Sequence, residues 1–126
     1  MSASLTSLRQ GLLRLHKTLL DWERDQYERL HGRQSNTDLL NAFLEHPQFA
    51  WLRPMSQLIV RIDEMLEDKA APQATDVDVI LGSAQLLTSP NESGDEYARR
   101  YHTALQENPD AVVAHRELVV LLTRDH

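Results

Sequence analysis

The sequence predicts an all-α protein: a six-helix, bundle-like single domain over residues 1–126, organised around a long N-terminal helix. Three observations support this. Apolar residues recur at the three- and four-residue spacing of buried helix faces, and Ser, Thr and Asn mark several helix starts. No stretch shows the sustained apolar–polar alternation of a strand. A chain of 126 residues is also close to the usual size of one domain.

The first predicted helix spans residues 4–31 and carries two apolar seams. The first seam consists of Leu5, Leu8, Leu12, Leu15, Leu19 and Trp22. The second seam consists of Leu13, His16, Leu20, Glu23, Tyr27 and Leu30. At 1.5 Å per residue the helix is about 40 Å long, which exceeds the roughly 36 Å width of a compact domain of this size. We therefore expect it to cross the whole molecule, with room for two layers of helices or for one layer and a second subunit.

The next predicted helices span residues 36–46 and 48–68. Gly32 suits the end of the preceding helix, and Ser35 with Asp38 forms a capping box. Pro54 interrupts the second of these helices, because proline removes a hydrogen bond and crowds the preceding turn. Either the helix kinks there, or residues 47–52 form a separate turn and the main helix begins at Pro54. The second alternative is favoured, because proline suits a first helical position.

Three further helices are predicted over residues 75–88, 94–107 and 109–124. Their expected starts are a Thr75–Asp78 capping box, a Ser93–Glu96 capping box, and Asn108 followed by Pro109. The last helix is apolar nearly all round. Such a helix is normally central in the core or covered by a partner.

Composition excludes several functional classes. The formal net charge is -6, and residues 62–96 carry nine acidic residues against Lys69 alone. No segment is strongly basic, so nucleic-acid binding is not expected. The longest apolar run, residues 118–122, is far too short for a membrane span, and no signal peptide is recognised. The absence of cysteine excludes thiolate chemistry and fits a cytoplasmic location.

No catalytic motif is present. The chain lacks a Gly-x-Ser-x-Gly elbow and both glycine-rich phosphate-binding patterns. It contains one Glu-x-x-His spacing, Glu28 to His31, where di-iron bundles use two. We therefore expect no cofactor and a non-catalytic function.

The apolar surplus of the first and last helices instead predicts an interaction or regulatory protein. We expect a homodimer, or contact with another protein, with interface candidates Leu13, Trp22, Tyr27 and Trp51. For Trp51 a core position is the favoured alternative, because a chain with seven aromatic residues usually buries most of them.

A second hypothesis is a metal-binding or small-ligand-binding bundle. His16, Glu23 and His115 could converge on such a site if the first and last helices pack together. Histidine on an apolar face is, however, more often a core or interface residue. The basic–aromatic stretch 97–102 could likewise hold an anion, although inward-packing tyrosines with arginines turned to the acidic segment are favoured.

Overall fold

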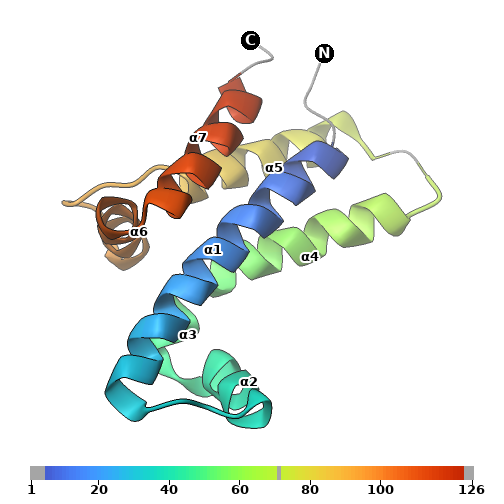
Figure 1. Cartoon of the computed structure of the whole chain (residues 1–126). Helices are drawn as coiled ribbons and strands as arrows, with labels where there is room; N and C mark the ends of the chain where they lie inside the picture. The colour runs from blue at the N-terminus through green and yellow to red at the C-terminus, as the bar shows by residue number, and fades with distance from the viewer. Residues whose placement is uncertain (1–4, 71, 124–126) are drawn as a thin grey trace.

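The computed structural model describes residues 5–70 and 72–123, and within these residues it contains seven α-helices and no strand (Figure 1). The predicted all-α class is confirmed. The helices are α1 (Leu5–His31), α2 (Asn36–Glu45), α3 (Pro47–Ala50), α4 (Arg53–Glu67), α5 (Ala74–Leu87), α6 (Glu96–Glu107) and α7 (Pro109–Thr123). The predicted outer ends at residues 4 and 124 lie outside the described residues.

The first helix is the unbroken rod that the sequence predicts. Its 27 residues extend about 40 Å, and the leucines of its first seam at positions 8, 12, 15 and 19 are fully buried. The helix ends at Gly32, whose φ of 82° is left-handed and whose N–H donates to the carbonyl of Glu28. The predicted glycine stop is therefore confirmed.

The core forms where α4 and α7 pack against the first seam of α1. Helix α5 packs against α4 and α7, and α6 packs against α7. Gly11 allows α7 to approach closely, because a Cβ atom at this position would lie only 2.9 Å from Cδ1 of Leu118. The buried members contributed by α4 to α7 include Met55, Leu58, Ile59, Ile62, Ile80, Ala84, Tyr101, Ala104, Ala111, Ala114, Leu118 and Leu122.

The predicted helix 48–68 is two helices, which raises the count from six to seven. Helix α3 is a single turn started by His46, whose Nδ1 accepts a hydrogen bond from the N–H of Gln48. Helix α4 then begins at Arg53 with Pro54 in its first turn. Proline thus starts the long helix instead of kinking it, as the favoured alternative stated.

The N-cap residues predicted for four helices are confirmed at two helices and wrong at the other two. Ser35 accepts from the N–H of Asp38, and Asn108 accepts from that of Asp110. Helix α5 starts after Gln73 and not at Thr75, without a side-chain cap. Helix α6 is capped by Asp95 and not by Ser93.

Helix α2 lies apart from the main bundle. Figure 1 shows it beyond the C-terminal end of α1, away from α5, and it contacts α3. It buries Leu39 and Ala42 but exposes 56% of Leu40 and 62% of Leu44. Part of its apolar surface is therefore uncovered by this chain.

A central position in the core was one of the two expectations for the last helix, and α7 does not have it. Its buried face consists of Ala111, Ala114, Leu118 and Leu122, while Val113 and Val120 are exposed on the other side. In the described part of the chain, no helix has the length and apolar character needed to cross a bilayer.

Candidate functional site

Three concave sites border the second seam of α1; the third, about 400 Å³ between Tyr27 and α2, includes the acidic residues Asp38 and Glu45 in its lining. We call the first the polar pocket; it has a volume of about 320 Å³ and is lined by Trp22, Glu23, Gln26, Leu30, Gln48, Arg99, Arg100 and Thr103. We call the second the apolar hollow; it has a volume of about 250 Å³ and is lined by His16, Leu20, Phe43, Leu44, Phe49, Leu52, Arg53 and Ser56. The second seam therefore contributes to all three sites. The first seam buries the leucines at positions 8, 12, 15 and 19 in the core, and its last residue, Trp22, lines the polar pocket.

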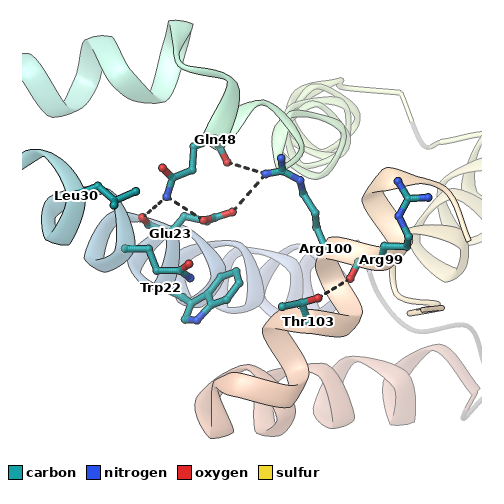
Figure 2. A pocket seen from close by; sticks show the side chains of 8 residues that line it. Trp22, Glu23, Leu30, Gln48, Arg99, Arg100 and Thr103 are labelled. Carbon is teal, nitrogen blue, oxygen red and sulfur yellow. Dashed lines mark hydrogen bonds and ion pairs between the residues drawn. The ribbon is translucent and has the colours of Figure 1, made fainter. Parts of the chain in front are cut away.

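Glu23 connects α1 to α3 and α6 from inside the polar pocket. Its carboxylate is 5% exposed and accepts hydrogen bonds from Nε1 of Trp51 and, at 3.1 Å, from Nε2 of Gln48. Nη1 of Arg100 lies 3.9 Å from the same carboxylate. A buried carboxylate needs such partners, because burying an unpaired charge is costly. Figure 2 shows Gln48 and Arg100 pointing at Glu23 from α3 and α6.

The α6 wall of the polar pocket is basic. Arg100 is also 3.2 Å from the carboxylate of Glu96, and Arg99 donates a 3.0 Å hydrogen bond to the carbonyl of Gly94. On the other side of this helix Tyr101 is fully buried, and the hydroxyl of Tyr97 donates to the carbonyl of Leu87. The tyrosines thus pack inward as favoured, while the two arginines border a pocket.

The apolar hollow lies between the middle of α1 and the segment from α2 to the first turn of α4. Phe43 and Phe49 meet there with ring centroids 4.8 Å apart. Burial lowers the pKa of His16, because desolvation disfavours the charged imidazole. The hollow is therefore an apolar surface with a histidine that favours the neutral form.

The structure places His16, Glu23 and His115 in three different surroundings. His16 lines the apolar hollow and Glu23 lies in the polar pocket. His115 faces α6, where Nδ1 and the hydroxyl of Tyr101 share a 2.5 Å hydrogen bond, and burial lowers its pKa. Among the described residues, no group of three or more His, Asp or Glu side chains is arranged to hold a metal ion.

The four interface candidates are also separated. Leu13 is exposed on α1, and Trp22 is half-buried on the wall of the polar pocket. Tyr27 stacks in an aromatic cluster with His31, His46 and Phe49. Trp51 is buried inside the chain, as the core alternative stated, and offers little surface to a partner.

Sequence reasoning missed Gln26 and Gln48 as pocket residues. Trp22, Gln26 and Leu30 follow one another at four-residue spacing, which places them on one face of α1. That pattern was readable in the sequence, whereas the contact with α6 depends on tertiary packing. No known family model, curated protein or solved structure matches this chain.

Proposed function

We propose that this chain is a non-catalytic, cytoplasmic interaction protein that forms a homodimer through its apolar hollow. The observation that carries the proposal is the pair of exposed leucines on α2, Leu40 and Leu44, at the rim of a concave apolar surface. The same patch therefore presents protruding apolar side chains and a hollow of matching chemistry. A twofold dimer requires this kind of self-complementary patch, because each copy uses the same surface.

The surroundings of the hollow support an apolar partner. The other exposed residues on the face of α2 that carries Leu40 and Leu44 are Asn36, Thr37 and Asn41, all uncharged, while the exposed acids Asp38 and Glu45 lie on the adjacent side. Arg53 is the charged residue in the lining, and its guanidinium donates a 2.9 Å hydrogen bond to the carbonyl of Leu44. Interface cores are depleted in charge, and arginine is the charged residue they favour.

The patch extends along the two long helices that border the hollow. Leu13 lies one turn from His16 on α1, and Val60 lies one turn from Ser56 on α4; both are exposed. A stable interface buries about 800 Å² per partner, about a tenth of the 8077 Å² surface of this chain. The hollow alone does not supply this interface area. Leu13, an interface candidate from the sequence, adds to it.

The exposed face of α7 is a weaker dimer surface. Val113 and Val120 are separated by the exposed residues Arg116 and Glu117, and Glu117 forms an ion pair with Arg14. Burying this face would desolvate charges without an evident replacement partner.

The test is the oligomeric state of Leu44→Glu compared with Leu86→Glu. Both leucines are exposed on helices, 62% at Leu44 and 74% at Leu86, so neither change empties the core. We expect the parent and Leu86→Glu to sediment as dimers and Leu44→Glu as a monomer. A carboxylate buried without a partner costs about 3 kcal/mol or more, which weakens dimerisation about 100-fold. A monomeric parent, or a dimer that Leu86→Glu breaks and Leu44→Glu leaves intact, would refute the proposal.

A further inference from the structure

We propose that the polar pocket binds a small organic carboxylate that carries one aromatic ring. This inference does not depend on self-association, because the polar pocket and the apolar hollow share no lining residue. It rests on the charges of the lining, on hydrogen-bond donors without partners, and on an apolar wall beside them.

The charges of the lining favour an anion. The lining contains two arginines, Arg99 and Arg100, and one carboxylate, Glu23; outside the lining, Glu96 pairs with Arg100 at 3.2 Å. That carboxylate already accepts hydrogen bonds from Trp51 and Gln48, so its capacity as an acceptor is largely used. The lining residues themselves therefore carry one more positive than negative charge, and a guanidinium binds a carboxylate better than a neutral group.

The hydrogen-bonding groups left over in the pocket are donors. Nε2 of Gln26 is shielded from solvent and has no hydrogen-bond partner among the described residues. Nε of Arg100 pairs with Glu96 at 3.2 Å, but the contacts of its Nη1 are long, 3.5 Å to the carbonyl of Gln48 and 3.9 Å to Glu23. A buried donor without a partner destabilises the protein by about 1–3 kcal/mol. A ligand oxygen that accepts from Gln26 and Arg100 would remove that penalty.

The apolar wall of the pocket suits a ring. Trp22 and Leu30 lie two turns apart on the same face of α1, with Gln26 between them. Figure 2 shows both side chains emerging from α1, on the opposite wall from Arg100 and Thr103. An aromatic ring packed on the Trp22 indole gains both buried area and ring–ring contact.

The volume limits the size of the ligand. About 320 Å³ is at the lower end of the range for small-molecule pockets. This leaves room for one ring and a short acidic group, and not for a nucleotide.

The experiment is a titration of the full chain with phenylacetate, followed by calorimetry and by the indole N–H signal of Trp22 in proton–nitrogen NMR spectra. Phenylacetamide and inorganic phosphate are the comparison probes. We expect saturable binding of phenylacetate with a shift of the Trp22 signal. Phenylacetamide lacks the charge and phosphate lacks the ring, so each should bind at least about tenfold more weakly.

Variants connect the binding to these residues. Gln26→Leu and Arg100→Gln should each weaken phenylacetate binding about tenfold, because each removes a donor to the carboxylate. Gln26→Leu breaks no described hydrogen bond, so it tests the pocket even if loss of the Arg100–Glu23 contact disturbs folding. Arg116→Gln, an exposed arginine on α7 outside the lining, is the matched control and should bind as the parent does.

Three results would overturn the proposal. They are the absence of saturable phenylacetate binding, equal affinity for phenylacetamide or phosphate, and unchanged affinity in Gln26→Leu. None of them affects the dimer proposal, whose test uses only Leu44 and Leu86.

Discussion

Among single residues, Glu23 of α1 contacts three other parts of the chain through its carboxylate. From α1 it accepts a hydrogen bond from Trp51, which lies just before α4, and another from Gln48 in α3. It also faces Arg100 of α6. The sequence singled out Glu23 because it shares the second seam of the first helix with His16. Its partners could not be predicted, because they come from residues 25 to 77 positions away along the chain and depend on how α3 and α6 pack.

Replacing Glu23 by Ala should lower the free energy of unfolding by about 3 kcal/mol, because it leaves the donors of Trp51 and Gln48 without their acceptor. Urea unfolding at fixed protein concentration measures this. The matched control is Asp21→Ala on the same helix, which removes an exposed ion pair with Lys17 and should cost less than about 1 kcal/mol. Equal losses in the two variants would show that the Glu23 contacts contribute nothing special to stability.

The histidines His16 and His115 should make the protein less stable in mild acid. Burial lowers both pKa values below the ordinary value of 6.5 in the folded chain. Between the folded and unfolded pKa values the unfolded chain binds more protons, so stability rises with pH and is lost as the pH falls through this range. We expect a lower urea midpoint at about pH 5 than at about pH 7.

The double variant His16→Gln, His115→Gln is the control for this pH dependence. It removes both imidazoles, so its midpoint should change less over the same interval. Because carboxylates titrate mostly below this interval, they contribute little to the difference. An unchanged slope in the double variant would assign the pH dependence to other groups.

At the scale of the helices, local sequence signals predicted which helices exist more accurately than where each helix begins. Apolar spacing and helix-start signals together correctly predict α1, α2 and α4 to α7, and Pro54 correctly marks the start of α4. The cap of α6 was misplaced because Ser93 and Asp95 are both good caps two residues apart. The choice is made by a turn at Asn91, whose side chain accepts from the N–H of Ser93 and whose own N–H donates to the carbonyl of Ala98. That turn forms only once α6 is in place, so the sequence alone could not select Asp95.

The two helical glycines Gly11 and Gly82 should respond in opposite directions to alanine. A Cβ atom at Gly82 meets nothing within 4 Å, so Gly82→Ala should stabilise the protein by about 1 kcal/mol through helix propensity. At Gly11 the Cβ atom would press on Leu118, which is fully buried and has little room to move. We expect Gly11→Ala to destabilise the protein by about 1 kcal/mol, because overpacking outweighs propensity. Thermal unfolding of both variants measures this, and stabilisation by Gly11→Ala would mean that the α1–α7 contact is loosely packed.

At the scale of the whole molecule, the two seams of the long first helix have different roles. The leucines of the first seam at positions 8, 12, 15 and 19 are buried by α4 and α7, while the second seam is only partly covered, with α3 packed against α1. The sequence predicted the surplus of apolar surface from the length of α1 and its two seams. It could not predict where the surplus would emerge, because the position of α2 relative to α1 is set by the connection at residues 32–35 and by packing on α3.

If the uncovered surface is a dimer interface, stability must depend on protein concentration. Dimerisation stabilises the folded state by mass action, so a tenfold increase in concentration adds about 1.4 kcal/mol per dimer. For a dimer of this total length that corresponds to a rise of about 3–5 °C in the melting temperature. Leu44→Glu should melt at a temperature that does not change with concentration, because the monomer unfolds alone, whereas Leu86→Glu should follow the parent. A constant melting temperature of the parent over a tenfold change in concentration would contradict the dimer. Leu40 and Leu44 would then be in water in the functional state, and the apolar hollow would need another partner.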